Sequence, residues 1–284
     1  MKSIKNLKDD MDYLTGFLTM VESYEEIAAL RMRKVKKSIL ERREFMQGLN
    51  EAFAYISYAY RIYRESLKGK AKERIINTNG KTVSILLSSN SGLYGDIIIN
   101  TFELFREETS KIDTDIVIVG KLGKNMYENL SEKKNYRYFE MTDNVIDELS
   151  IKKLSDYILD YSNVIVYHGS FRSFISQVPT RTEVPVELRR IERSLESYDE
   201  KFLFEPSIEK IAEYFEKQIE SLIFEQVVFE SYLSKFASRM VSMDVASENI
   251  SSKIRRVDID MKKAKHKNIN SAMHSAIFGG SLWK

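Results

Sequence analysis

The stretch Ser207–Phe278, SIEKIAEYFEKQIESLIFEQVVFESYLSKFASRMVSMDVASENISSKIRRVDIDMKKAKHKNINSAMHSAIF, contains no glycine and no proline, and it follows directly on Pro206. A single helix of that length would be on the order of 100 Å long, because an α-helix rises by about 1.5 Å per residue. An ordinary compact domain is narrower than that. The stretch therefore predicts either several helices with hidden turns or one long helix that organises the rest of the chain.

The apolar residues in the second part of this stretch favour one long helix. They recur in steps of four and three residues, with Ser247 as the polar exception, at Phe229, Leu233, Phe236, Met240, Met243, Ile250, Ile254, Val257, Met261 and Ala264. A repeat of 3.5 residues is typical of a coiled-coil seam. The alternative is an amphipathic helix on a globular core, which the pattern favours less because it lasts for about five heptads without a cap or breaker.

The N-terminal residues show the same periodicity. Glu25 and Arg42 interrupt an apolar series with steps of four and three, which runs through Ile4, Leu7, Met11, Leu14, Leu18, Val21, Ala28, Met32, Val35, Ile39, Met46, Leu49, Phe53, Ile56, Tyr60 and Tyr63. Gly16 and Gly48 weaken this helix by about 1 kcal/mol each without ending it. Since neither apolar seam can face water along its length, we expect the two helices to pair as an antiparallel coiled coil.

The middle of the chain changes to short apolar runs. We expect strands at 81–88, 115–120, 136–141 and 163–168, helices at 96–110, from about 124 and at 144–161, an edge hairpin at 171–188 and a linker at 189–200. Strands that alternate with helices are typical of a largely parallel sheet. The predicted fold class is therefore α/β with long helices, in which residues 1–68 and 206–284 form the coiled coil and residues 75–200 a small, mostly parallel α/β domain.

The composition excludes several kinds of chemistry. The chain has no cysteine and three histidines, His168, His266 and His274. Cysteine-based metal sites and disulfides are therefore excluded, and the histidines lack the clustered carboxylates of a metal site. Gly92 to Gly95 forms a turn between a strand and a helix but lacks the third glycine of a dinucleotide fingerprint. We expect no cofactor, no metal ion and no catalytic residue on this chain.

Two basic runs leave a further alternative open. They cover residues 31–43 and 253–267, while the net charge of the chain is only +2. Such runs are typical of a solvated coiled-coil face, of a nucleic-acid-binding scaffold or of a contact with an acidic protein surface. A nucleotide-binding enzyme built on the α/β domain is the second alternative. We expect no signal peptide, because the first residues are charged and amphipathic, and no membrane span, because no apolar stretch is long enough to cross a bilayer.

A set of motifs, ordered along nearly the whole chain, resembles the γ subunit of F-type ATP synthases. Leu87–Gly95 (LSSNSGLYG) is similar to that family's TSDRGLCGG turn, and Val119–Gly123 (VGKLG) to its GRKG segment. Residues 171–180 resemble its F-x-S and Q-x-P-T stretch, and Phe204–Pro206 and Glu220–Ser221 its YEP and ES positions. Residues 237–249 (ASRMVSMDVASEN) resemble AARM-x-x-M-x-x-A-T-D-N and are the most specific match.

Two segments depart from the family pattern. Residues 19–33 (TMVESYEEIAALRMR) stand where the family has KITKAMxMVAASKMR, so that acidic residues replace lysine and threonine. Residues 269–281 stand where it has ITKEITEIVGGA, and the acidic residues are missing.

The resemblance implies a mechanical role, as a central-stalk rotor in a hexamer of α- and β-like subunits that carry the ATP chemistry. An alternative is the shaft of a paralogous, F-type-like ATPase that drives another process, such as gliding motility in mycoplasmas. The resemblance also implies an ε-like subunit, a membrane rotor ring or its substitute, and a peripheral place on the cytoplasmic side of the membrane. The partner-interface residues that we expect are Tyr24, Arg31, Arg33, Arg239, Met240, Arg256, Phe278 and Trp283, with Gly92, Leu93 and Gly95 at the foot turn.

Overall fold

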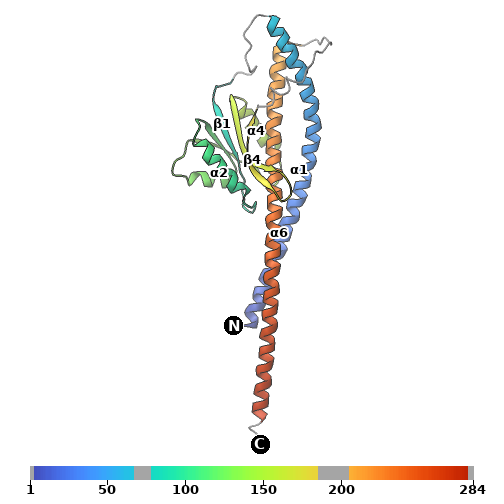
Figure 1. Ribbon diagram of the computed structural model, residues 1–284, viewed down its shortest axis with the longest axis vertical. Helices are drawn as coiled ribbons and strands as arrows, with labels where there is room; N and C mark the ends of the chain where they lie inside the picture. Colours follow the sequence, from blue (N-terminus) through green and yellow to red (C-terminus); the bar gives the residue numbers. More distant parts are fainter. Residues whose placement is uncertain (1–2, 67–77, 185–204, 281–284) are drawn as a thin grey trace. The chain divides into compact units, whose positions relative to one another are not determined.

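The computed structural model describes residues 3–66, 78–184 and 205–280. It divides into two compact units, which we treat separately. The terminal unit comprises residues 1–29 and 239–284, and the central unit residues 30–238. Figure 1 labels the elements and colours them along the sequence.

Each end of the described chain forms one unbroken helix. Helix α1 runs over Ile4–Ser66 and helix α6 over Ile208–Gly280. Neither Gly16 nor Gly48 ends α1. The glycine- and proline-free stretch is therefore one helix, and the alternative of several helices with hidden turns is wrong.

A five-stranded sheet lies in the central unit. Its strands are β1 (Thr82–Leu87), β2 (Asp115–Val119), β3 (Tyr136–Phe139), β4 (Asn163–Phe171) and β5 (Gln177–Val184), in the order β3-β2-β1-β4-β5. The first four are mutually parallel, and β5 is antiparallel to β4. The predicted, mostly parallel sheet is thus confirmed. The hairpin differs from expectation, because β4 continues to Phe171 and β5 pairs with it as the edge strand.

Three shorter helices connect the strands, and two of them begin at residues other than those predicted. Helix α2 covers Ile97–Thr109, α3 Lys121–Glu128 and α4 Glu148–Ile158. We expected α3 to begin after Gly123, but Gly120 takes a positive φ of 95° and the helix starts directly behind it. We expected α4 from residue 144, but Asp147 caps it by accepting from the backbone N–H groups of Leu149 and Ser150. The predicted linker at 189–200 lies outside the described residues.

Aromatic and aliphatic side chains from the sheet, α2 and α3 form the core. Phe105 is fully buried and packs edge-on against Tyr167, with ring centroids 5.3 Å apart. The cluster also contains Leu86, Phe102, Ile116, Ile118, Tyr127 and Ile165. Strand β4 approaches α6 closely, because a Cβ added at Gly169 would lie 2.6 Å from the Ser234 hydroxyl oxygen. The sheet is therefore packed against α6 as well as against α2.

Helices α1 and α6 run antiparallel within each unit. In the central unit, Arg31 lies over the ring of Phe236, and Arg42 lies over the ring of Phe229. A later residue of α1 thus contacts an earlier residue of α6, as in an antiparallel pair. In the terminal unit, Val21, Met243 and Ile250 form a buried cluster. Leu14, Leu18, Ala246 and Ile254 pack against it. These contacts confirm the predicted coiled coil.

Among the described residues, no helix combines the length and the apolar character that crossing a lipid bilayer requires.

Candidate functional site

The turn between β1 and α2 is held by a carboxylate from a distant part of the chain. Asp143 accepts hydrogen bonds from the backbone N–H groups of Asn90 (2.9 and 3.0 Å) and Ser91 (2.9 Å), and from the Ser91 hydroxyl (2.9 Å). Backbone N–H groups at such a turn can bind a phosphate. Here the Asp143 carboxylate already accepts from these N–H groups, so the turn has a structural role.

Two glycines after β2, Gly120 and Gly123, lie very close to the β1–α2 turn. A Cβ at Gly120 would lie 2.7 Å from the backbone oxygen of Ser89, and one at Gly123 would lie 2.6 Å from the Ser88 Cβ. The Asn90 side chain accepts from the Lys121 N–H (3.0 Å) and donates to the Met141 carbonyl (2.5 Å). The turn is therefore built from close backbone approaches that only glycine permits at residues 120 and 123.

Three polar side chains of helix α6 donate hydrogen bonds to backbone carbonyls in and near this turn. Lys235 is buried, donates to the Ser88 carbonyl (3.0 Å) and lies 4.3 Å from the centre of the Tyr232 ring. Ser238 donates to the Tyr94 carbonyl (2.6 Å), and Tyr232 donates to the Thr142 carbonyl (2.5 Å). A buried lysine loses hydration, which its hydrogen bond and the ring face partly replace.

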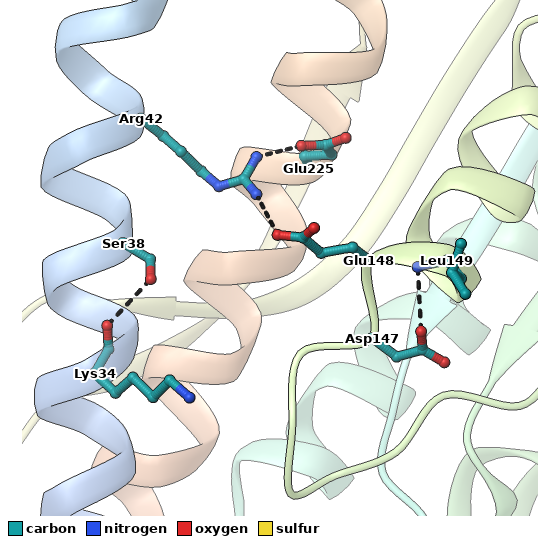
Figure 2. Close-up of polar contacts among 7 residues, drawn as sticks. All are labelled: Lys34, Ser38, Arg42, Asp147, Glu148, Leu149 and Glu225. Atoms are coloured by element: carbon teal, nitrogen blue, oxygen red, sulfur yellow. Dashed lines mark hydrogen bonds and ion pairs between the residues drawn. The ribbon is translucent and has the colours of Figure 1, made fainter.

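Helix α1 reaches the same region through two arginines. Arg42 binds Glu225 of α6 and Glu148 at the start of α4, the latter at 3.2 Å, while its guanidinium lies 4.3 Å from the centre of the Phe229 ring. Figure 2 shows the guanidinium placed between the two carboxylates. Arg31 donates to the Asn144 side chain (2.6 Å) and lies 5.9 Å from the centre of the Phe236 ring.

These contacts converge on residues 142–148, which follow β3 and end at the first residue of α4. The segment receives Tyr232 from α6 at Thr142, Arg31 at Asn144 and Arg42 at Glu148. It also supplies Asp143 to the β1–α2 turn. We call residues 142–148 the bracket segment. It joins both long helices to the sheet within the central unit.

His168 belongs to the core of the central unit. It is 1% exposed, and its ring nitrogens lie 3.0 Å from the Gly169 carbonyl oxygen and 2.9 Å from the Thr182 hydroxyl. Burial lowers the pKa of His168, because the charged imidazolium loses hydration. In the described part of the chain, no three histidine, aspartate or glutamate side chains gather where they could hold a metal ion.

The residues that the sequence predicted for partner contacts fall into three groups. Tyr24, Arg33 and Arg256 are exposed on the long helices, whereas Met240 is half-buried and Arg239 is only 4% exposed. Arg31 makes the internal contacts given above. Phe278 lies in the last turns of α6, its side chain is outside the described part, and Trp283 lies outside the described residues altogether.

The foot-turn residues lie in the β1–α2 turn. Leu93 is 55% exposed and takes a positive φ of 68°, and Gly95 takes a φ of 58°. Gly92 has open space around its Cα, since a Cβ there would meet nothing within 4 Å. The turn thus presents an apolar side chain, Leu93, at the surface of the central unit.

Sequence reasoning missed Asp143, Lys235 and Glu148. Asp143 lies about fifty residues from the turn that it holds, so no local motif announces it. Lys235 stands beside the seam residue Phe236, at a position that the apolar repeat leaves to polar residues, so its burial had no signal in the sequence. Arg42 interrupts the apolar series of α1, but no local pattern indicates its partners, Glu225 and Glu148.

The family model described as ATP synthase matches residues 3–280. The chain belongs to this family. Curated relatives named ATP synthase gamma chain match over the full length. The one from Geotalea daltonii is 24% identical over 295 residues, covering 100% of both chains. The one from Buchnera aphidicola is 21% identical over 292 residues, covering 99% of this chain and 98% of the relative. The chain is thus a gamma-type member of the ATP synthase family.

Solved structures of the family share the fold. The central stalk and c-ring structure of the mitochondrial ATP synthase of Tetrahymena thermophila contains a chain that matches with a TM-score of 0.56 and 17% identity, covering 80% of this chain and 99% of that one. A chain of the Euglena gracilis mitochondrial enzyme matches with a TM-score of 0.53 and 14% identity, covering 89% and 95%. The comparisons favour neither a paralogous motor with another load nor a scaffold or nucleic-acid-binding protein.

Proposed function

We propose that this gamma-type chain is the rotating shaft of a complex in which α- and β-like partner subunits form a hexamer and carry out the ATP chemistry. The match of the family model to residues 3–280 carries the proposal. An asymmetric shaft that contacts each partner differently gives the partners different nucleotide affinities, so that rotation and binding are coupled. The chain itself then contributes no catalytic residue.

The terminal unit supports this proposal with an exposed helix end. Every described side chain of α6 from Lys265 to Ile277 is exposed. The large apolar ones among them are Ile269 (55%), Met273 (61%) and Ile277 (69%). Exposed apolar side chains on a helix mark a surface that a partner covers. We propose that this end, with Phe278 and Trp283, sits in an apolar bearing formed by the hexamer.

Exposed cations support contacts with acidic partner surfaces. Arg33 of α1 and Arg256 of α6 are exposed, whereas Arg31 and the buried Arg239 offer a partner little surface. Of the predicted arginines we therefore propose Arg33 and Arg256 for these contacts, with Met240 and Tyr24 as neighbouring apolar contacts. Complementary charge of this kind orients a partner more than it adds affinity.

The central unit supports a different contact. Its β1–α2 turn presents Leu93 beside Gly92 and Gly95, and the bracket segment ties the sheet to both helices. We propose that this unit is the foot of the shaft, where an ε-like subunit and a membrane rotor ring or its substitute attach. The chain would then be peripheral, on the cytoplasmic side of the membrane.

The test is a pull-down from native cells with the tagged full-length chain. We expect α- and β-like ATPase subunits to co-purify in a hexamer, with less recovered by Arg33→Ala/Arg256→Ala than by the matched variant Lys152→Ala, whose side chain is exposed on α4. A pull-down free of nucleotide-binding subunits would refute the proposal. The presence of a membrane ring in the same eluate identifies the load.

A further inference from the structure

A small cavity lies between helix α6 and the sheet, inside the central unit. Its lining comes from the ends of β1 and β2, from residues that follow β3 and from one face of α6. Every lining residue in the described part of the chain is at most 8% exposed, so the cavity is separated from bulk solvent. Its volume is about 10 Å³, which is close to the room that one water molecule requires.

Polar side chains line this cavity from both sides. Ser88 and Asp143 contribute to the lining from the sheet side, and Ser231 and Lys235 contribute from α6. The Lys235 ammonium donates to the Ser88 carbonyl (3.0 Å), so a cation and a carboxylate both belong to the wall. An apolar cavity stays dry, whereas polar lining groups allow a cavity of this size to hold water.

Two hydroxyls in the lining require a ligand. Ser88 and Ser231 are 4% and 2% exposed, and within the described residues neither side-chain oxygen has a hydrogen-bond partner. A buried hydroxyl without a partner has lost its hydration and gained nothing in exchange, which costs free energy. A small ligand in the cavity that can both donate and accept would satisfy the two hydroxyls together.

Ser231 differs from other hydroxyl residues on the long helices. Thr15, Thr19 and Ser23 of α1 and Ser275 of α6 each donate to the backbone carbonyl four residues earlier. This local bond is open to any serine inside a helix. The Ser231 hydroxyl does not make it, and its side chain lines the cavity instead. The side chain is therefore placed to bind a ligand in the cavity.

We propose that this cavity binds one water molecule, which bridges α6 to the sheet. The volume has room for one water molecule and not for an organic ligand. A metal ion would face the Lys235 ammonium, and an anion would face the Asp143 carboxylate, so the charges of the wall disfavour both. Water is neutral, and it can donate to the carboxylate and accept from the ammonium or the hydroxyls.

Asp143 has acceptor capacity left for this water. Its Oδ1 and Oδ2 share the N–H of Asn90, at 3.0 and 2.9 Å, and Oδ2 also accepts from the N–H and the hydroxyl of Ser91. Each carboxylate oxygen has about two lone-pair sites. Oδ1 can therefore accept a further hydrogen bond, and the bridge runs from Ser231 through the water to Ser88 and Asp143.

The bridge adds to the direct contacts between α6 and the sheet side of the central unit. Tyr232, Lys235 and Ser238 donate to backbone carbonyls there. Ser231 lies about one helical turn before Lys235, so the water extends this row of contacts by a turn. The inference goes beyond the proposed function and does not rest on it, because all of the contacts lie within the central unit.

A high-resolution crystal structure of the full-length chain tests the proposal directly. We expect one peak of electron density within hydrogen-bonding distance of the side-chain oxygens of both Ser88 and Ser231. Crystals kept under xenon gas should show no xenon at this place, since xenon binds in dry apolar cavities. Absence of the peak, xenon in the cavity, or a peak with the short contact distances of a metal ion would overturn the proposal.

Two serine substitutions on α6 test it in solution. Ser234 is the matched control for Ser231, because it is 0% exposed and its hydroxyl also has no partner among the described residues, but it does not line this cavity. Alanine raises the helix propensity equally at both positions. Ser231→Ala should therefore have a Tm about 3 °C below that of Ser234→Ala, since only Ser231→Ala takes a hydrogen bond from the water.

Equal Tm values for the two variants would mean that Ser231, like Ser234, has an unpaired hydroxyl, and the bound water would be rejected. The crystal structure of the unchanged chain decides the matter if either variant fails to fold. A pull-down without ATPase subunits would refute the proposed function and leave both of these measurements intact.

Discussion

The same pair of helices is stabilised in two different ways in the two compact units. In the central unit, the polar interruption of the α1 seam is Arg42, which has two carboxylates and an aromatic ring as partners. In the terminal unit the interruption is Glu25, whose neighbours Asp244 and Glu22 are also acidic, and whose pKa is raised by burial and by those charges. A charged residue at a seam position thus has partners of opposite charge in one unit and like-charged neighbours in the other.

This difference corresponds to a difference in what surrounds the helices. The bracket segment and the β1–α2 turn give α1 and α6 of the central unit many polar partners. Among the described residues of the terminal unit, by contrast, an apolar cluster around Val21, Met243 and Ile250 is the core of the helix pair. A partly buried charge with partners on other elements, such as Arg42, specifies register, because any slip along the helix leaves it unpaired. An apolar seam specifies register less strictly.

The largest effect is expected from Arg42→Ala. The substitution removes the guanidinium that lies between Glu225 and Glu148 and over the Phe229 ring, and it leaves the half-buried Glu225 without this cation. We expect a loss of about 2–3 kcal/mol in the free energy of unfolding, at the low end for a broken ion pair because Arg42 is partly exposed. Chemical denaturation followed by circular dichroism measures it.

Lys34→Ala is the matched control for this prediction. Lys34 lies two turns away on α1 and is exposed, and its backbone carbonyl accepts from Ser38 whatever its side chain (Figure 2). A surface substitution of this kind changes stability by about 0.5 kcal/mol or less. If the two variants lose the same stability, the contacts of Arg42 do not distinguish the central unit.

A somewhat smaller loss is expected from Ile250→Ala in the terminal unit. Ile250 is 6% exposed within a small apolar cluster, so the truncation leaves a cavity. We expect a loss of about 2 kcal/mol, near the lower limit for such changes because two helices collapse around a cavity more readily than a globular core. Hydrogen exchange should accelerate at residues 11–28 and stay unchanged in the sheet. Acceleration in the sheet as well would show that the two units unfold together.

The helices and strands of both units were predictable from periodicity, but the polar contacts that distinguish the units were not. The heptads defined α1 and α6, and the short apolar runs defined the strands, because both patterns follow from local geometry. Arg42 and Glu225 lie 183 residues apart, and Asp143 holds a turn about fifty residues away, so the partners depend on tertiary packing that no local pattern encodes. The start of α4 was misplaced for a related reason, since Asn144 resembles a helix cap but its side chain accepts from Arg31, and Asp147 serves as the cap.

A gain in stability is expected from Glu25→Gln. The amide removes the charge that burial, Asp244 and Glu22 disfavour, while keeping the size and helical propensity of the side chain. We expect an increase of about 0.5 kcal/mol in the free energy of unfolding at pH 7, a small gain because Glu25 is only half-buried. Glu41→Gln, at an exposed position of α1 in the central unit, should give no gain because Glu41 has an i,i+4 ion pair with Lys37. A loss on Glu25→Gln would mean that the carboxylate is stabilised by a cation after all.

The smallest expected effect is that acid changes the stability of the two units in opposite directions and in different pH ranges, so that mild acid changes only the terminal unit through these two groups. Glu25 has a folded pKa above its ordinary value of 4.5, so the folded terminal unit binds the proton more readily than the unfolded chain does. Its stability therefore rises as the pH falls through that folded pKa, and the gain is complete below 4.5. Asp147 of the central unit behaves in the opposite sense. Hydrogen bonds, first from the Ser150 hydroxyl and then from the backbone, lower its pKa, so the stability it contributes above pH 3.8 is lost as the pH falls through the lowered value.

Hydrogen exchange measured between pH 7 and pH 4.5, and corrected for intrinsic rates, gives the protection of the backbone amides in both units from one sample. Protection at residues 18–28 should rise relative to that at residues 147–158, and Glu25→Gln should remove the rise because it leaves no carboxyl group to titrate there. If the rise persists in Glu25→Gln, another carboxyl group causes it. If protection falls equally in both units, the acidic interruption of the seam does not set the pH response of the terminal unit, and the contrast between Arg42 and Glu25 is one of geometry alone.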